Sequence, residues 1–96
     1  MPLDEELANT LRYYFVHQPV KRAYVFGSVA RGEATSQSDI DVLVEFDKGA
    51  TLFDQARMSW QLEDCLHRKV DVIAESGLSH HIRPFIYRDR ILVYEK

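Results

Sequence analysis

The strongest constraint on the fold is a run of seven residues, Ile40–Phe46 (IDVLVEF), that is rich in β-branched and apolar side chains. A turn sequence, Asp47-Lys48-Gly49, follows it, so the run has the length and boundaries of a buried β-strand. Asp39 and Asp41 stand at its start. Because successive side chains of a strand point to opposite faces, these two carboxylates share a face at about 7 Å. Like charges at that separation repel by about 2–3 kcal/mol at an effective dielectric constant of about 20, which a purely structural strand would avoid.

Hydrophobic periodicity along the rest of the chain predicts alternating helices and strands. Helices are predicted over residues 3–17 and from the N-cap Thr51 through about 67. A short helix is predicted within 79–89, with Pro84 in its first turn or kinking it, and strands over residues 22–26, 40–46, 69–74 and 90–94. The loop between the first two strands is too short for a long crossover helix, which predicts an antiparallel pair or one helical turn from about Ala30 onward. The order predicts an α/β (α+β) fold, with a small mixed sheet of about four strands and flanking helices, in a single domain over residues 1–96.

The second long helix carries the clearest local signals. Thr51 is predicted to be its N-cap, with Asp54 three residues later in a capping box. An apolar stripe is predicted to face the core; it consists of Leu52, Ala56, Trp60 (or Ser59), Leu62 and Leu66. Phe53 and Trp60 are interpreted as core or interface residues, and Cys65 as a small buried hydrophobe.

Composition narrows the class of protein. The formal net charge of −3 argues against a protein that binds duplex nucleic acid in general. Cys65 is the only cysteine, which fits a reducing compartment. The acidic start of the chain lacks the apolar core of a signal peptide. Its apolar runs are far shorter than the roughly 20 residues that cross a bilayer, so we expect a cytoplasmic protein.

Asp71 interrupts the third predicted strand as Asp39 and Asp41 interrupt the start of the second. If these strands are neighbours about 4.8 Å apart, the three carboxylates converge on one patch. Carboxylate oxygens suit Mg²⁺, which recruits substrate phosphates to complete its shell, and two such ions would serve phosphoryl-type transfer. Taken singly, each acid also fits a solvated strand mouth or an edge strand; together they favour a metal site.

Gly27-Ser28 directly follows the first predicted strand. Glycine permits a sharp turn with close backbone approach, and exposed N–H groups after it suit a phosphate, although such a pair also fits a plain turn. A phosphate cradle beside a metal patch indicates a nucleoside-triphosphate site.

Gly27-Ser28, ten residues, then Asp39-Ile40-Asp41, and Asp71 within a later strand together resemble the polymerase-β-type nucleotidyltransferase superfamily, with its palm-like fold. The string GSVARGEATSQSDIDVLVEF is similar to the small minimal nucleotidyltransferase group. The resemblance implies that Asp39 and Asp41 bind both metal ions, and that Asp71 binds the catalytic ion and helps to deprotonate the attacking hydroxyl. It also implies that Gly27 and Ser28 hold the β- and γ-phosphates while a nucleoside monophosphate passes to a hydroxyl and pyrophosphate leaves.

The minimal members are similar to antitoxins encoded beside a helical HEPN-domain ribonuclease. This resemblance implies transfer of AMP from ATP to a tyrosine of that toxin. Two alternatives stay open: a catalytically idle module that neutralises its partner by binding alone, and a transferase that acts on a small molecule or an RNA end. An exposed sheet face also leaves room for a homodimer.

A few residues have two interpretations. Arg31 could bind a phosphate group through its planar guanidinium, or form an ion pair with Glu33 at the surface. His80 and His81 are adjacent, so on a helix they point about 100° apart and cannot chelate one ion together. Acceptors for self-modification are left open among four tyrosines: Tyr13, Tyr14, Tyr87 and Tyr94.

Overall fold

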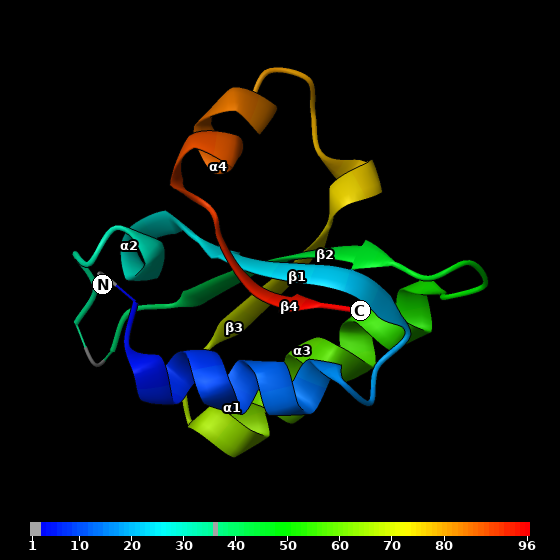
Figure 1. Ribbon diagram of the computed structural model, residues 1–96, viewed down its shortest axis with the longest axis horizontal. Helices are drawn as coiled ribbons and strands as arrows, with labels where there is room; N and C mark the ends of the chain where they lie inside the picture. Colours follow the sequence, from blue (N-terminus) through cyan, green and yellow to red (C-terminus); the bar gives the residue numbers. More distant parts are fainter. Residues whose placement is uncertain (1–2, 36) are drawn as a thin grey trace.

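The computed structural model describes residues 3–35 and 37–96 (Figure 1). Its elements, in chain order, are α1 (Glu5–Phe15), β1 (Val20–Phe26), α2 (Gly27–Ala30), β2 (Ile40–Phe46), α3 (Leu52–Leu66), β3 (Val70–Ala74), the short 3₁₀ turn η1 (Glu75–Gly77), α4 (Arg83–Asp89) and β4 (Ile91–Glu95). The strand order is β3-β2-β1-β4. β1 is antiparallel to both β2 and β4, whereas β2 and β3 are parallel. The predicted mixed four-strand sheet with flanking helices is therefore confirmed.

Helices α1 and α3 lie on one side of the sheet and α4 lies on the other (Figure 1). The Tyr14 hydroxyl donates a hydrogen bond to Gln61 Oε1 at 2.6 Å, which joins α1 to α3. The main core lies between these two helices and the sheet; its members include Leu11, Phe15, Val42, Val44, Met58, Leu62, Val70 and Val72. Leu43 is buried outside that cluster, as is Ile86 of α4, so the other face of the sheet is also partly covered.

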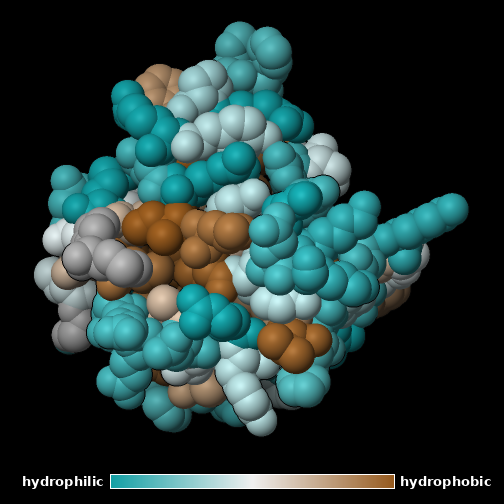
Figure 2. All heavy atoms as spheres, viewed as in Figure 1, coloured by the Kyte–Doolittle hydropathy of each residue, from teal (hydrophilic) through white to brown (hydrophobic). Residues whose placement is uncertain are grey.

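Apolar surface remains beside this core. Figure 2 shows hydrophobic residues gathered above α1 and next to α2, on the face that looks toward the reader. None of the helices among the described residues is long and apolar enough to cross a membrane.

The connection between β1 and β2 contains the predicted helical turn, but the turn begins earlier than expected. It spans Gly27–Ala30, directly after Phe26, rather than starting near residue 30. Gly27 has a φ of +75°, a backbone conformation that glycine adopts without the steric cost of a Cβ. The chain therefore turns sharply at the end of β1, where the sequence predicted a glycine turn.

The capping box of α3 is present as predicted. The Thr51 N–H donates to Asp54 Oδ2 at 2.7 Å, and the Thr51 side chain and the Asp54 backbone complete the reciprocal pair. The predicted apolar stripe was wrong at its N-terminal half, because Leu52 and Trp60 are 82% and 67% exposed. Leu62 is buried as predicted, and Met58, which the predicted stripe left out, is buried with it.

Polar side chains explain this rotation of α3. Gln55 Nε2 donates to Val72 O at 2.8 Å, and Ser59 Oγ donates to Val70 O. These two side chains of α3 therefore provide hydrogen-bond donors for backbone carbonyls of β3. Turning these two residues toward β3 leaves Phe53 86% exposed, which excludes it from the core. Cys65 is also exposed, so its predicted burial was wrong.

The short helix predicted within residues 79–89 is present as α4, and η1 precedes it as a further turn. The structure has η1 at Glu75–Gly77, then a turn, and α4 only from Arg83 to Asp89. Pro84 occupies the first turn of α4, where its missing N–H would have no helical partner in any case. The remaining strands match the prediction to within two residues.

Candidate active site

Asp41 and Asp71 lie directly beside each other in the sheet. They are register partners on the parallel strands β2 and β3, which confirms that the two acid-bearing strands are neighbours. Their flanking residues Val42, Val70 and Val72 are buried toward α1 and α3. Since side chains alternate along a strand, both carboxylates face the opposite side of the sheet, which is the side of α4. Asp39 comes immediately before β2, so the three predicted acids meet at one end of these strands.

The charges of the three acids act on one another. Burial raises the pKa of the Asp41 carboxyl above its ordinary value, and the negative charges of Asp71 and Asp39 raise it further. The positive charges of Arg31 and Lys69 oppose this effect. The positive charges of the protein therefore do not fully balance the negative charge of ionised Asp41. A bound cation at this position would balance it.

The Gly27 turn lies against the same carboxylate. A Cβ atom on Gly27 would stand 2.5 Å from Asp41 Oδ2, which is closer than a real Cβ approaches any oxygen. The positive φ favours glycine, and any other residue would also have to displace the Asp41 carboxylate. The turn predicted to hold phosphates and the acids predicted to hold metal are consequently adjacent, and Ser28 follows within α2.

The donor set fits Mg²⁺ in its chemistry. Asp39, Asp41 and Asp71 offer only hard carboxylate oxygens, and the missing Cβ of Gly27 leaves room for the Asp41 carboxylate. Within residues 3–35 and 37–96, no three His, Cys, Asp or Glu side chains are arranged closely enough to enclose a metal ion by themselves. An ion held here would therefore need water and substrate phosphates to complete its shell.

Arg31 forms the surface pair with Glu33 and a second pair that the sequence did not indicate. Its Nε lies 2.8 Å from Glu33 Oε1, and its Nη1 lies 3.1 Å from Asp89 Oδ2 of α4. It is also one of the two cations that lower the pKa of Asp41, so it lies within electrostatic reach of the acids. The predicted phosphate contact remains a prediction.

The two adjacent histidines are both exposed, and the centroids of their rings are 6.4 Å apart. Among the four tyrosines, Tyr87 donates its hydroxyl proton to Glu75 Oε1 at 2.6 Å, and this hydrogen bond raises its pKa. Tyr13 is 76% exposed. No contact between a tyrosine and the acids singles out an acceptor in the described part of the chain.

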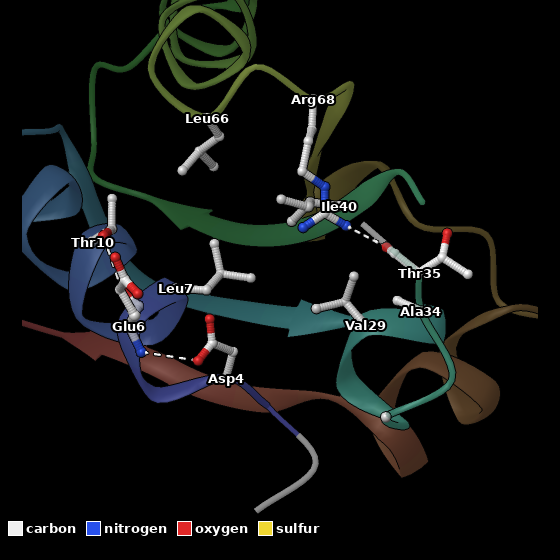
Figure 3. Close-up of a pocket in the computed structure, with 11 residues that line it drawn as sticks. Asp4, Glu6, Leu7, Thr10, Val29, Ala34, Thr35, Ile40, Leu66 and Arg68 are labelled. Atoms are coloured by element: carbon white, nitrogen blue, oxygen red, sulfur yellow. Dashed lines mark hydrogen bonds between the residues drawn. The ribbon is translucent and has the colours of Figure 1, made fainter. Parts of the chain in front are cut away.

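A cavity of about 410 Å³ lies behind the loop that leads to Asp39 (Figure 3). Its walls come from α1, α2 and the start of β2, through residues that include Leu7, Val29 and Ile40. Figure 3 shows Arg68 pointing from the other wall toward Thr35. Asp39, Asp41 and Asp71, together called the acid patch below, are not among its described lining residues. The cavity is therefore separate from the acid patch.

The sequence pattern did not predict a role near the site for Arg68, Lys69 or Arg90. Lys69 lowers the pKa of Asp41, and Arg90 stacks between the rings of Tyr24 and Tyr87, 4.2 and 4.0 Å from their centroids. Adjacent positive charges before the third strand were the only available signal for the first two. Stacking of Arg90 on Tyr24 depends on a contact between segments far apart in the chain, for which the sequence carries no local sign.

A family model for the nucleotidyltransferase domain matches residues 5–93. A protein of Methanocaldococcus jannaschii, provisionally named a protein adenylyltransferase, is 47% identical over 73 residues, which are 76% of this chain and 73% of that protein. The protein adenylyltransferase MntA of Thermococcus cleftensis is 35% identical over 74 residues, which are 77% of this chain and 75% of that protein.

Solved structures give the same fold. A structure provisionally described as a minimal nucleotidyltransferase superposes with a TM-score of 0.69 at 43% identity, covering 90% of this chain and 85% of its own. A toxin–antitoxin crystal structure with AMP-PNP gives a TM-score of 0.76 at 17% identity, covering 97% and 75%. A complex of a tri-AMPylated Shewanella oneidensis HEPN toxin with an MNT antitoxin gives 0.71 at 14% identity, covering 97% and 74%.

Proposed function

Because this chain belongs to the nucleotidyltransferase domain family, we propose that it transfers AMP from ATP to a hydroxyl group of a partner protein. The acceptor is a tyrosine of a HEPN-type toxin encoded nearby, and the chain acts in the cytoplasm as the antitoxin of that pair. Residues 1–96 serve as a single nucleotidyltransferase domain. The names of the relatives support AMP transfer to protein, and the complex that contains a tri-AMPylated HEPN toxin supports the partner.

One observation carries the proposal. Asp41 and Asp71 are paired in register, burial and the charges of Asp71 and Asp39 raise the pKa of Asp41, and the Gly27 turn lies against the same carboxylate. A cluster of this kind destabilises an apolar strand unless it binds something cationic. Binding of a partner by surface contact alone would not require it, which argues against the idle-module alternative.

Each residue then has a role in the transfer. Asp39, Asp41 and Asp71 hold two Mg²⁺ ions, and Gly27, Ser28 and Arg31 hold the β- and γ-phosphates of ATP. Bound Mg²⁺ supplies charge neutralisation on the phosphates and favours ionisation of the attacking hydroxyl. The acceptor oxygen forms a bond to the α-phosphorus, the bond from that phosphorus to the bridging oxygen breaks, and pyrophosphate leaves. Asp71 helps to accept the proton of the hydroxyl.

Exposed aromatic residues support a macromolecular partner. Phe53 and Trp60 are seven positions apart on the outward face of α3, and they are 86% and 67% exposed. Aromatic side chains are enriched in protein interfaces and are unfavourable when two of them share a hydrated surface. The interface role predicted for these two residues therefore stands as part of this proposal, after the structure excluded them from the core.

The test offers the protein ATP labelled at the α-phosphate, with Mg²⁺ and the neighbouring HEPN-type protein. We expect stable label on that partner, no label from γ-labelled ATP, and loss of transfer with a chelator or in the Asp39→Ala, Asp41→Ala variant. Asp64→Ala is the matched control, because Asp64 is an exposed acid on α3, on the other side of the sheet.

Three results would contradict the proposal. Label on tRNA or aminoglycosides, but not on protein, would indicate a small-molecule or RNA transferase. Inhibition of the partner without nucleotide, and equally by the double variant, would indicate neutralisation by binding alone. Transfer that persists in the double variant would remove the acids from the mechanism.

A further inference from the structure

Arg68 holds the loop that delivers Asp39 to the acid patch. The residue lies between α3 and β3, directly after His67, whose left-handed backbone (φ +55°) ends the helix abruptly. Its Nε and Nη2 both donate to Ser38 O, at 3.1 and 2.7 Å. Nη2 also donates to Thr35 O at 3.3 Å. The guanidinium therefore joins two carbonyl groups of one loop, a geometry that its planar fork suits and a lysine cannot reproduce.

The carbonyl of Ser38 belongs to the peptide group immediately before Asp39. On the other side of Asp39, the Ile40 N–H donates to Lys69 O at 2.9 Å. Two consecutive residues, Arg68 and Lys69, thus fix the peptide groups on both sides of Asp39. Asp71 follows them after one more residue, so the same short segment sets the positions of Asp39 and Asp71 relative to each other.

In this loop Ala34 packs against the core, whereas Thr35 and Ser38 are held by hydrogen bonds. Ala34, Thr35 and Arg68 line the cavity of about 410 Å³ that lies behind it (Figure 3). Within the loop, the Ser38 N–H donates to Thr35 O at 3.1 Å, and the Thr35 N–H donates to Ser38 Oγ at 2.9 Å. These bonds shape the turn but do not attach it to the body of the protein. The contacts of Arg68 do attach it.

We propose that Arg68 is a positioning residue, which acts through the loop carbonyls to set Asp39 against Asp41 and Asp71 for metal and triphosphate binding. This inference rests on the proposed function for its catalytic consequence. Its structural part stands on the three hydrogen bonds alone and can be measured without any transfer reaction.

The experiment compares Arg68→Ala, Arg68→Lys and Arg12→Ala in the full chain. Arg12 is the matched control, because its Nε likewise donates to a backbone carbonyl, Val93 O of β4 at 3.2 Å, at the opposite edge of the sheet. In metal-free protein, hydrogen–deuterium exchange of the Ser38 and Ile40 amides should accelerate in Arg68→Ala and stay unchanged in Arg12→Ala. Circular dichroism establishes that each variant remains folded.

Metal binding and kinetics give the second readout. Mn²⁺ affinity, followed by electron paramagnetic resonance, should fall about 10–100-fold in Arg68→Ala, as for other residues that orient metal ligands. The apparent kcat should fall by a similar factor, with recovery by raised Mg²⁺ and little change in the KM for ATP. Arg68→Lys should restore only part of the loss, because it keeps the charge without the fork.

Unchanged loop exchange and Mn²⁺ affinity in a folded Arg68→Ala variant would overturn the inference. An equal effect of Arg12→Ala would do the same, because it would reveal a general loss of stability. If the wild-type chain transfers no AMP, the proposed function fails, yet the exchange and Mn²⁺ measurements still decide the role of Arg68.

Discussion

At the scale of single residues, the most constrained position in the site is Gly27. Its φ of +75° lies in the left-handed region, and its missing Cβ leaves room for the Asp41 carboxylate. Gly49 shares the first property, with a φ of +93°, but among the described residues no atom beyond its own chain neighbours lies within 4 Å of the Cβ position there. Substituting alanine at Gly49 therefore measures the cost of the backbone conformation alone. The same substitution at Gly27 adds the cost of displacing the Asp41 carboxylate.

We predict that Gly27→Ala and Gly49→Ala each lose about 1–2 kcal/mol of folding stability from the left-handed backbone. Gly27→Ala should lose more, because the new methyl group displaces Asp41 Oδ2. AMP transfer should fall by about 100-fold or more in Gly27→Ala alone, since small misplacements of reacting groups have effects of that size. Urea unfolding and initial transfer rates check this. Equal transfer by both variants would contradict it.

Asp41 allows a prediction about pH. Its pKa is raised in the folded state by burial and by Asp71 and Asp39, so the folded protein binds its proton more tightly than the unfolded chain does. The associated stability is fully present below the ordinary pKa of 3.8 and is lost as the pH rises through the higher folded value. Ionised Asp41 consequently lowers the folding stability of the metal-free protein at neutral pH.

Asp41→Asn should therefore be more stable than the wild-type protein at pH 7 in the presence of a chelator, while losing AMP transfer. The difference in unfolding free energy should close as the pH falls below 3.8. Urea titrations at several pH values measure it. A variant that is less stable than the wild type at pH 7 would show that the carboxylate is satisfied by the protein itself.

At the scale of elements, the strands were predictable and the rotation of α3 was not. Ile40–Phe46 has both its limits marked in the sequence, by the acids and by a turn, and its observed bounds are the predicted ones. In α3, apolar residues occupy two overlapping faces, one with Leu52 and Trp60 and one with Met58 and Leu62. The choice depends on carbonyl groups at the edge of β3, which no local pattern records.

The observed rotation predicts contrasting effects of two substitutions in α3. Met58 is fully buried, so Met58→Ala should cost about 2–5 kcal/mol of stability. Trp60 is 67% exposed, so Trp60→Ala should change stability by no more than about 0.5 kcal/mol. Chemical denaturation of the isolated protein measures both. The reverse order of effects would restore the stripe that periodicity alone predicted.

The candidate site divides in the same way. Residue types and spacing identified Asp39, Asp41, Asp71 and the Gly27-Ser28 turn, and the parallel pairing of β2 and β3 brings Asp41 and Asp71 into register. Arg68 could not be identified, because its partners are backbone carbonyls, which any residue supplies. A carboxylate within an apolar strand is unusual, so the sequence alone marks it as a candidate functional residue. An arginine in a loop is common, so the sequence does not mark it.

At the scale of the whole molecule, α4 is fastened to the acid-bearing side of the sheet largely by side chains. Arg90 stacks between Tyr24 of β1 and Tyr87 of α4, and Asp89 binds Arg31 beside α2. Ile86 is the only buried residue of this seven-residue helix. A segment with so few buried apolar contacts opens more readily than the core does.

Arg90→Ala should accordingly loosen α4 while the sheet and the other helices stay intact. Two cation–π contacts are worth about 0.5–1 kcal/mol each at exposed sites, so the loss of stability should be about 1–2 kcal/mol. Amide exchange should accelerate within Arg83–Asp89 and not in β2 or α3. Arg88→Ala is the control, because the Arg88 side chain is 70% exposed and contacts only Phe85 (5.5 Å) in this way. Acceleration across the whole chain would instead make α4 part of the cooperative core. Selective acceleration would show that α4 opens independently of the rest of the fold.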